Sequence, residues 1–397
     1  MLTLPVYLDN HATTRVDPRV VDAMLPYFTE AYGNAGSSSH PFGWRAKEAV
    51  DGARQAIAQA IHASSREIVF TSGATESNNL ALRGVTERQR KKGNHIVSVL
   101  TEHKSVLDPL ARLSRRGLEV TLVGVRPHDR RDAGRVDLQQ LAEAIRSETI
   151  LVSVMFVNNE TGVIAPLREI AALCRERGVL LHCDATQAVG KIPVDVTEFD
   201  VDLMSFSAHK IHGPKGIGAL FVRRREPLVR LEPLFDGGGQ EGGLRSGTLN
   251  VPGIVGFAAA LTLSIAELSA ESERLRRLRN QLFAELAARI DGVHLNGPAL
   301  DDPALRVPGN LNCSMAGVDG EALMMNMRDV AVSSGSACTS TNPEPSHVLR
   351  ALGLPPDLVR ASLRFGLGRF NTSEEIEFVI TRVADTIGHL RRLTTRS

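Results

Sequence analysis

Lys210 and Asp184 are the two residues of this sequence whose types and positions most directly indicate chemistry. Lys210 closes the strand-like stretch that ends in Ser207-Ala208-His209-Lys210, and Asp184 closes the run Leu180-Leu181-His182-Cys183-Asp184. An amine that forms a Schiff base and a carboxylate that pairs with a pyridine nitrogen are what pyridoxal phosphate requires of a protein. A helix cap explains Asp184 equally well when it is taken alone. Together the two residues predict a pyridoxal-phosphate enzyme.

Three further polar groups could complete a cofactor site. Gln187 follows Asp184 by three residues and could donate to the phenolic oxygen of the cofactor, although a polar loop residue is the ordinary explanation. The stretch from Thr71 to Glu76 joins a strand to a helix, and its backbone N–H groups and hydroxyls could hold a phosphate or only cap the helix. Ser207 and His209 flank the turn of Lys210, where they could complete a phosphate site or bond to local backbone.

His103 follows the strand predicted from His95 to Leu100. If it stacks on the cofactor ring it is the natural proton shuttle, because histidine titrates near neutral pH, but a lone histidine at a strand end more often has a structural role. His103, Asp184, Lys210 and the loop around Thr75 all fall at carboxyl ends of predicted strands. Ligands bind at that edge of open α/β sheets, so the four positions favour one shared site.

A single cysteine, Cys338, lies in a segment that is almost free of large apolar side chains, from Ser333 to Asn342. Such a segment cannot be anchored in a core, and we expect it to be exposed and mobile, with an accessible thiol. An incidental surface thiol is the alternative. The other three cysteines, Cys174, Cys183 and Cys313, occupy apolar helix or strand positions typical of buried cysteine.

Arg364 is a guanidinium in the apolar, strand-like stretch from Ala361 to Gly366. It could bind the carboxylate of an amino-acid substrate bidentately, or it could form a structural salt bridge. A metal site built from His182, Cys183 and Asp184 is disfavoured, because alternation along a strand places Cys183 on the face opposite the other two. None of the cysteine spacings fits a zinc ribbon or a redox Cys-x-x-Cys motif.

Short β-branched runs alternate with helical stretches over the first part of the chain, which predicts an α/β fold with an open, mostly parallel sheet. The predicted strands are 68–71, 95–100, 120–125, 150–157, 179–183, 203–206 and 219–222, and the predicted helices are 79–90, 105–115, 138–145 and 167–177. Later elements, a helix over 271–290, strands at 311–314 and 330–333 and a helix over 373–393, predict a smaller α+β unit. We predict a large domain of residues 17–265 and a small domain of residues 1–16 and 266–397.

Composition narrows the class of protein. The chain has 397 residues, with 46 basic and 45 acidic side chains and a formal net charge of +1, which leaves no global electrostatic attraction for nucleic acid. The amino terminus lacks a basic leader before Asp9, and the uncharged stretch from Leu249 to Ala266 contains enough polar, Gly and Pro residues to favour a core helix over a membrane span. We therefore expect a cytoplasmic enzyme without a membrane segment, in a reducing compartment.

The whole chain resembles the pyridoxal-phosphate cysteine desulfurases of the class V aminotransferase superfamily, in particular the housekeeping iron-sulfur-cluster type. The motifs that carry the resemblance, in chain order, are Ala12-Thr13-Thr14, Thr71 to Ser77, Thr101 to Lys104, Val157 to Glu160, Asp184 to Gln187, Ser205 to Lys210, Gly213 to Gly218, Arg245 to Thr248, Ser333 to Ser340 and Arg364 to Phe370. The resemblance implies the type I pyridoxal-phosphate transferase fold. It also implies conversion of L-cysteine to L-alanine, with the sulfur passed to an enzyme cysteine as a persulfide.

The resemblance also assigns roles to individual residues. It implies that Lys210 holds the cofactor covalently, that His103 stacks on its ring and moves protons, and that Cys338 attacks the substrate sulfur. The remaining residues implied in cofactor or substrate binding are Ala74, Thr75, Asn159, Asp184, Gln187, Ser207, His209, Thr248 and Arg364. Of these, Thr248 would reach the phosphate of a neighbouring subunit, which implies a homodimer, while Asn159 and Arg364 would bind the substrate carboxylate.

Partners follow from the same resemblance. An iron-sulfur scaffold or another sulfur-acceptor protein is expected, and Cys338 could ligate a nascent cluster together with that scaffold, although no intrinsic metal site is expected. The sequence departs from relatives at His11, at Phe156, at the turn Asn34 to Ser37 and in its short C-terminal end. A selenocysteine lyase, a plain class V aminotransferase and a catalytically silent partner-binding subunit are the alternatives.

Overall fold

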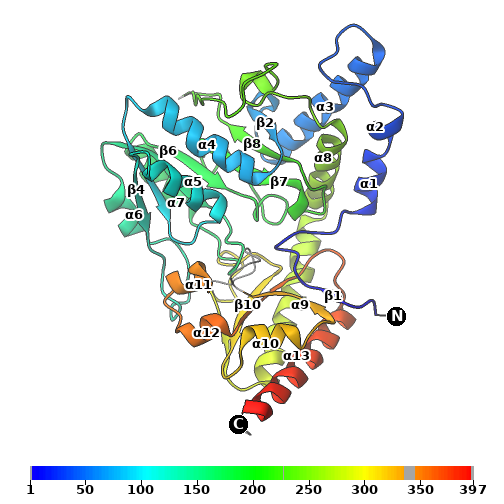
Figure 1. Ribbon diagram of the computed structural model, residues 1–397, viewed down its shortest axis with the longest axis vertical. Helices are drawn as coiled ribbons and strands as arrows, with labels where there is room; N and C mark the ends of the chain where they lie inside the picture. The colour runs from blue at the N-terminus through cyan, green and yellow to red at the C-terminus, as the bar shows by residue number, and fades with distance from the viewer. Residues whose placement is uncertain (1, 227, 335–344, 395–397) are drawn as a thin grey trace.

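The fold is built on a seven-stranded sheet in a computed structural model that describes residues 2–226, 228–334 and 345–394. The strand order is β2-β8-β7-β6-β5-β3-β4 (Figure 1). The strands are β2 (Ile68–Thr71), β3 (His95–Val99), β4 (Glu119–Val123), β5 (Thr149–Met155), β6 (Leu180–Asp184), β7 (Leu203–Ser207) and β8 (Gly218–Val222). The five strands from β4 to β7 pair in parallel, whereas β8 runs antiparallel to both β2 and β7. The predicted mostly parallel sheet is therefore confirmed.

Helices cover both faces of this sheet, because alternate strand residues point to opposite sides. On one face α4 (Ala74–Gln89) and α5 (Lys104–Ser114) bury Leu80 and Leu110 against strand residues such as Ile96. The opposite face carries α3 (Pro41–Ala60), α6 (Leu138–Ala144), α7 (Leu167–Glu176) and α8 (Val251–Ala266). Between residues 18 and 60 the chain forms three helices, α1 (Pro18–Met24), α2 (Pro26–Thr29) and α3. None of the three was predicted from the sequence.

A second, smaller sheet lies in the C-terminal part of the chain. It contains β12 (Ser333–Ser334), β13 (Ser362–Gly366), β10 (Asn310–Met315) and β9 (Val293–Leu295), in that order and antiparallel throughout. Its core is shared with α9 (Leu268–Arg289) and α13 (Ser373–Thr394), which bury Leu282 and Val383. Short helices α10 (Gly320–Met325), α11 (His347–Ala351) and α12 (Pro356–Arg360) complete this part (Figure 1).

The strand predicted over residues 330–333 is in fact two strands in different sheets. Val330 and Ala331 form β11, which pairs in parallel with β1 (Val6–Tyr7), whereas β12 pairs with β13. The amino-terminal residues therefore pack on the C-terminal core, where Val6 and Leu8 are fully buried. This supports our proposal that residues 1–16 and 266–397 form one domain and residues 17–265 the other.

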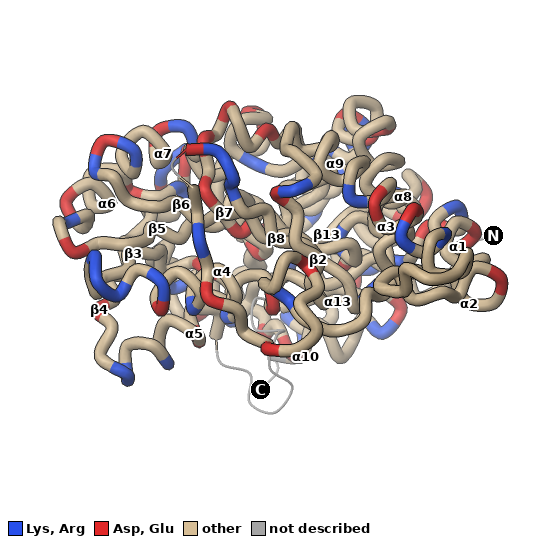
Figure 2. The backbone as a smooth tube through the Cα atoms, turned by 90° about the horizontal axis from the view of Figure 1, so that it is seen from above, with Lys and Arg blue, Asp and Glu red and all other residues tan. Residues whose placement is uncertain are grey.

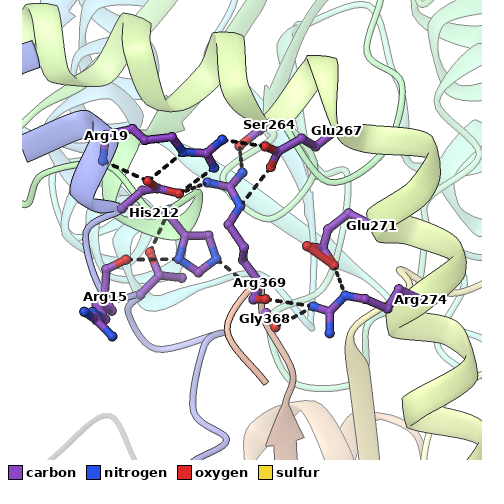
Figure 3. A network of polar contacts seen from close by, with 11 residues as sticks. Arg15, Arg19, His212, Ser264, Glu267, Glu271, Arg274, Gly368 and Arg369 are labelled. Atoms are coloured by element: carbon purple, nitrogen blue, oxygen red, sulfur yellow. Dashed lines mark hydrogen bonds and ion pairs between the residues drawn. The ribbon is translucent and has the colours of Figure 1, made fainter. Parts of the chain in front are cut away.

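An ion-pair network joins these two parts (Figure 3). Asp17, the N-cap of α1, accepts hydrogen bonds from Arg19 and from Arg369, which follows β13. Glu267, at the junction of α8 and α9, pairs with both arginines as well. Asp17 has only 2% of its side chain exposed, and its hydrogen bonds with Arg19 hold the pKa of its carboxyl far below the usual range. The network thus anchors the segment after β13 to the start of α1.

No single helix among the residues described in the structure is long and apolar enough to cross a membrane; α8 and α9 pass that test only as a pair, bent by 73°. The α8 helix begins at Val251, next to Pro252, and Asn250 caps it by accepting a hydrogen bond from the Gly253 N–H. Its buried residues include Phe257 and Leu261, as the sequence predicted for a core helix. Along the chain the basic and acidic residues are interspersed (Figure 2), as the net charge of +1 suggests.

Candidate active site

A cavity of about 580 Å³ opens at the carboxyl ends of the parallel strands, and we call it the strand-end cavity. Its volume is in the range usual for small-molecule sites. The residues predicted from the sequence that line it are Ala74, Thr75, His103, Asn159, Asp184, Gln187, Ser207, His209, Lys210 and Arg364. His103, Asp184, Lys210 and the loop around Thr75, which are far apart in the chain, therefore meet in one place, as their positions at carboxyl ends of strands predicted.

Lys210 ends a short 3-10 turn (Ala208–Lys210) that follows β7 directly. Its ammonium group donates hydrogen bonds to the carbonyl oxygens of His11 and Ala12, both at 2.6 Å. These acceptors belong to the amino-terminal segment, some 200 residues away in the chain. Backbone oxygens thus hold the amine at the cavity wall, and an amine in such a position can form a Schiff base with a carbonyl compound.

Asp184 ends β6, and both of its carboxylate oxygens accept hydrogen bonds. Oδ2 accepts from the amide of Asn78 at 2.8 Å, while Oδ1 accepts from the backbone N–H and the hydroxyl of Thr186, at 3.0 and 2.5 Å. Donors of this kind stabilise the ionised form of a carboxylate. The group is 3% exposed and lines the strand-end cavity, so it presents a fixed negative charge to whatever the cavity holds.

The loop from Ser72 to Thr75 leads into α4 and has the features of an anion site. The N-cap of α4 is Gly73, which offers no side-chain acceptor, whereas Asp17, Asp137, Asn250 and Asp319 cap other helices of this chain. The first N–H groups of α4 have no partner within the helix, and the loop lines the cavity. A Cβ on Gly218 would lie 2.7 Å from the Gly73 Cα, so β8 needs glycine for this loop to approach. Uncapped amides at a helix start suit a phosphate.

His103 is the N-cap of α5, and its geometry fixes the position of the ring proton. The backbone N–H of Ser105 donates to Nδ1 at 3.0 Å, so the neutral ring carries its proton on Nε2. Burial lowers the pKa of His103, an effect that the charge of Asp184 partly opposes. The ring is therefore neutral at physiological pH and can donate a hydrogen bond from its Nε2–H group.

Gln187 follows Asp184 in the same turn, and both its amide oxygen and its amide nitrogen already have hydrogen-bond partners. The oxygen accepts from Lys191 at 2.5 Å and lies 3.1 Å from His11 Nδ1, while the nitrogen donates to the His11 carbonyl at 2.9 Å. One amide N–H remains. Because Gln187 lines the strand-end cavity, this hydrogen is the one available to a bound group.

Arg364 lies on β13 and already has a carboxylate partner, as one of the two alternatives from the sequence proposed. Nη2 is 2.8 Å from Asp9 Oδ1, and Nη1 donates to the carbonyl of Asn159 at 3.1 Å. The buried Nε has no hydrogen-bond partner among the described residues. Because Arg364 also lines the strand-end cavity, its guanidinium group can favour a ligand with an acceptor oxygen.

The remaining predicted residues fall in different places. Ser207 donates to the Ile217 carbonyl at 3.3 Å, and His209 Nδ1 lies 3.1 Å from the Thr13 hydroxyl. Thr248 is exposed and does not line the strand-end cavity of its own chain. Cys338 lies outside the described residues.

The other cysteines are buried, as the sequence predicted, and His182 has a structural role. Cys174, Cys183 and Cys313 are buried, and burial raises the pKa of each thiol, to about 12 for Cys174 and Cys313. His182 is enclosed between the hydroxyls of Ser153 and Ser205, at 2.8 and 3.0 Å. Within the ranges that the structure describes, no group of three His, Cys, Asp or Glu side chains could hold a metal ion.

Sequence reasoning missed four residues that support the site. Asn78 and Thr186 hold the carboxylate of Asp184, Asp9 pairs with Arg364, and Lys191 contacts Gln187. Thr186 had a local signal, because Asp followed two residues later by Thr is typical of an Asx turn. The other contacts join distant segments or depend on the shape of a turn. The departure at Phe156 has no direct bearing on the site, since that ring packs against Phe199 with centroids 5.0 Å apart.

Comparisons with known proteins agree with this geometry. The aminotransferase class-V family matches residues 6–379. A protein named cysteine desulfurase IscS from Anaeromyxobacter sp. (strain Fw109-5) is 54% identical over 393 residues, covering 99% of this chain and 95% of the relative. The protein of the same name from Rickettsia massiliae (strain Mtu5) is 49% identical, covering 99% and 93%.

Solved structures give the same answer. A structure named NifS-like protein superimposes with a TM-score of 0.89 and 36% identity, covering 97% of this chain and 100% of that one. Another, described as SspA in complex with cysteine, has a TM-score of 0.79 and 32% identity, covering 92% and 100%. The chain therefore belongs to the class V aminotransferase family, whose members are pyridoxal-phosphate enzymes, and it has the type I fold. An amine, a fixed carboxylate and uncapped helix amides around one cavity fit that cofactor.

Proposed function

We propose that this chain is a pyridoxal-phosphate-dependent cysteine desulfurase, which converts L-cysteine to L-alanine and transfers the sulfur to Cys338. The observation that carries the proposal is the meeting of Lys210, Asp184 and the uncapped start of α4 in one cavity. The relatives named cysteine desulfurase, which match nearly the whole chain at 49–54% identity, support the choice of substrate. In the overall reaction the carbon–sulfur bond of cysteine breaks and a sulfur–sulfur bond to Cys338 forms, so the thiol becomes a persulfide.

The chain's own residues divide the work of binding. Lys210 would hold the cofactor covalently, the amides of Ala74 and Thr75 would bind its phosphate, and Asp184 would keep its ring nitrogen protonated. When bound, the cofactor supplies an electron sink that stabilises negative charge on the substrate carbon. His103 lines the cavity, where this residue would move the protons of the reaction.

Substrate binding falls to the opposite wall of the cavity. The guanidinium group of Arg364 would bind the carboxylate of cysteine, with Asn159 beside it. The segment that bears Cys338 leaves the described part of the chain at Ser334, one residue after Ser333, which itself lines the cavity. Cys338 is four residues beyond Ser334, a distance of at most about 14 Å for a chain segment of that length. A segment of this length would allow the thiol to reach the substrate.

Two measurements test the proposal. Borohydride reduction of the holoenzyme followed by peptide mapping should place the cofactor on Lys210. Incubation with cysteine followed by intact mass spectrometry should add one sulfur to the peptide that bears Cys338. The variant Cys338→Ala should keep the visible absorbance of the cofactor and lose sulfide release, whereas Cys174→Ala, at a buried position remote from the cavity, should retain both. A label on another residue, or undiminished turnover in Cys338→Ala, would contradict the proposal.

We further propose that the active unit is a homodimer and that it acts in the cytoplasm. The exposed position of Thr248, outside the cavity of its own chain, supports the expectation that this residue reaches the phosphate of a partner subunit. The sulfur acceptor would be an iron-sulfur scaffold or another acceptor protein. Sedimentation analysis of the wild type and loss of cofactor affinity in Thr248→Val would test the shared site; a fully active monomer would contradict it.

A further inference from the structure

A second, smaller cavity of about 60 Å³ lies behind Lys210, and we call it the inner cavity. Its wall includes Lys210 and His11, which also line the strand-end cavity. It also includes Lys191, a lysine that the reaction as derived above does not use. Lys191 ends the turn that follows β6, the same turn that carries Asp184 and Gln187. A partly buried lysine beside the cofactor-bearing lysine requires an explanation, because burying an ammonium group is costly.

The hydrogen bonds around Gln187 define what Lys191 does. Lysine carries only donors, so its contact with Gln187 at 2.5 Å requires the amide oxygen to face it. His11 Nδ1, 3.1 Å from the same oxygen, then also donates, and the His11 Nε2 is buried without a partner among the described residues. With its oxygen fixed by two donors, the amide turns its nitrogen the other way. One N–H reaches the His11 carbonyl, and the second is left for the strand-end cavity.

The charges around Lys191 are predominantly positive. Lys210 and Arg364 both repel its ammonium group, and His11, His209 and His212 also lie within its electrostatic range. Glu271 and Arg369 line the same inner cavity, but Glu271 pairs with Arg274, and Arg369 pairs with Asp17 and Glu267. No carboxylate lies within ion-pair distance of Lys191 in the described ranges. Burial, followed by the charges of Lys210 and Arg364, lowers the pKa of Lys191 to about 7.

We propose that Lys191 is a positioning residue, which fixes the Gln187 amide with an N–H toward the cofactor and places a positive charge behind the nitrogen of Lys210. The inference rests on the proposed function, since Lys210 must hold the cofactor for it to apply. Both effects act in the same direction on the resting Schiff base. A nearby cation disfavours the protonated nitrogen, and an N–H donated to the phenolic oxygen stabilises that oxygen in its ionised form, which weakens its hold on the shared proton.

Backbone geometry keeps Lys191 in this position. Gly190 has a φ of +75°, and a Cβ there would lie 2.9 Å from Ile211 and 3.2 Å from Ser264. The turn can therefore pack between the start of the Lys210 turn and α8 only because residue 190 is glycine. In this position the Lys191 N–H also donates to the Ala188 carbonyl at 2.9 Å. The lysine is part of a rigid turn and not a surface side chain that happens to reach inward.

The test is a pH titration of the visible absorbance of the holoenzyme, which reports the pKa of the Schiff base rather than activity. Lys191→Met keeps the length of the side chain and removes its charge and its N–H donors. We expect it to raise that pKa by about one unit, a tenfold increase in proton affinity. Lys191→Arg, which keeps the donors and stays charged across the titration, should not raise that pKa. Lys47→Met, on the exposed surface of α3, is the matched control and should leave the pKa unchanged.

A double-mutant comparison separates the role of Gln187 from that of charge alone. In a Gln187→Ala background, Lys191→Met should shift the pKa by less than it does in the wild-type background. The effect of Lys191 that acts through the Gln187 amide is already absent there, and only the effect of its charge remains. Loss of stability is not expected to obscure the result, since an apolar side chain of similar volume replaces a buried charge. The melting temperature of each variant checks this.

The outcomes are distinguishable. An unshifted pKa in Lys191→Met, or a shift of equal size in Lys191→Arg, overturns the role of Lys191 and leaves the proposed function intact. A wild type that contains no absorbance attached to Lys210 overturns the proposed function, and this inference falls with it. A shift confined to Lys191→Met, smaller when Gln187 is absent, supports both.

Discussion

Burial holds several histidines near the site in the neutral form. His182, His209 and His212 each have a pKa lowered to about 4, in every case chiefly by burial. For His182 the two serine hydroxyls replace water as partners, so the ring needs no charge to be satisfied. A neutral ring can therefore be buried close to Asp184 without adding a second charge to the site.

The depressed pKa of His182 makes a prediction about acid stability. The unfolded chain binds a proton at this histidine near pH 6.5, whereas the folded protein does so only near pH 4. Its contribution to stability is therefore complete above about pH 6.5 and is lost as the pH falls toward 4. His182→Gln, which can still bond both serines, should flatten the pH dependence of the unfolding free energy by about 1.4 kcal/mol per pH unit in that interval.

Denaturant titrations at several pH values between 7 and 4.5 would measure this slope. His294→Gln is the control, since His294 is exposed on β9 and its replacement should leave the slope unchanged. A variant at residue 182 whose stability declines as steeply as that of the wild type would show that the buried imidazole is not the source of the acid sensitivity.

Arg364 carries a prediction about substrate affinity. Arg364→Lys keeps the positive charge next to Asp9 but loses the planar arrangement of N–H donors that can bind Asp9, the Asn159 carbonyl and a substrate carboxylate together. We expect the KM for cysteine to rise at least about tenfold while the cofactor absorbance is retained, because one charge-assisted hydrogen bond contributes about 1.5–3 kcal/mol. Steady-state kinetics would measure it, with Arg360→Lys on exposed α12 as the control. An unchanged KM would assign Arg364 to the salt bridge alone.

At the scale of elements, the turn after β6 is the part of the chain that does most for the site. It runs from Asp184 to Lys191 and supplies a carboxylate, an amide and an ammonium group. Because Gly190 allows the turn to pack against Ile211 and Ser264, a single methyl group at this position should disturb the site.

Gly190→Ala and Gly178→Ala form a matched pair that tests this packing. Both glycines have positive φ, +75° and +63°, but a Cβ on Gly178 would meet nothing within 4 Å. Gly178→Ala should therefore cost about 1 kcal/mol of stability through backbone strain alone. Gly190→Ala should cost at least about 1 kcal/mol more and should also shift the visible absorbance of the cofactor. If both variants lost the same amount of stability in thermal or denaturant unfolding, the turn would accommodate the added methyl group without strain.

The elements that the sequence predicted best are those with a strong local pattern. The strands β2 to β8 and the helices α5 to α7 match within a few residues, because buried parallel strands are continuously apolar and the helices between them are amphipathic. The N-terminal helices α1 to α3 were missed, since the prediction concentrated on the alternation that begins at residue 66. The division of residues 330–334 between two sheets could not be predicted, because it depends on which distant strand each half meets.

At the scale of the whole molecule, the ion-pair network around Asp17 connects the part of the chain that contains the seven-stranded sheet with the part that contains the smaller sheet. Asp17→Asn should destabilise the protein by about 1.5–3 kcal/mol, because it removes a charge-assisted partner of Arg369, whose side chain is 10% exposed and which then retains Glu267 as its carboxylate partner. Asp357→Asn removes an exposed pair with Arg360 and should cost no more than about 0.5 kcal/mol. Chemical unfolding would compare the two variants. Similar small losses in both would show that the buried network adds little to stability.

The site illustrates which long-range information the sequence contains. Lys210, Asp184 and His103 were predictable, because each follows a recognisable strand and the carboxyl ends of parallel strands meet. The contacts that Asn78, Asp9 and Lys191 make with polar groups of the site were not predictable. They join segments that are distant in the chain or depend on the shape of a turn, and no local sequence pattern indicates them. Cys338 lies outside the described residues, and its role at the cavity remains a prediction.

The amino-terminal segment has a consequence for how the protein is made. Its carbonyl groups hold Lys210, Asp9 pairs with Arg364, and β1 pairs with β11, whose residues are more than 300 positions later in the chain. A ribosome adds about 5–20 residues per second, so this first-made segment waits on the order of tens of seconds for its partners. Nascent chains arrested before β13 should therefore be unable to capture the cofactor tightly, although Lys210, which we propose holds it, has long since emerged.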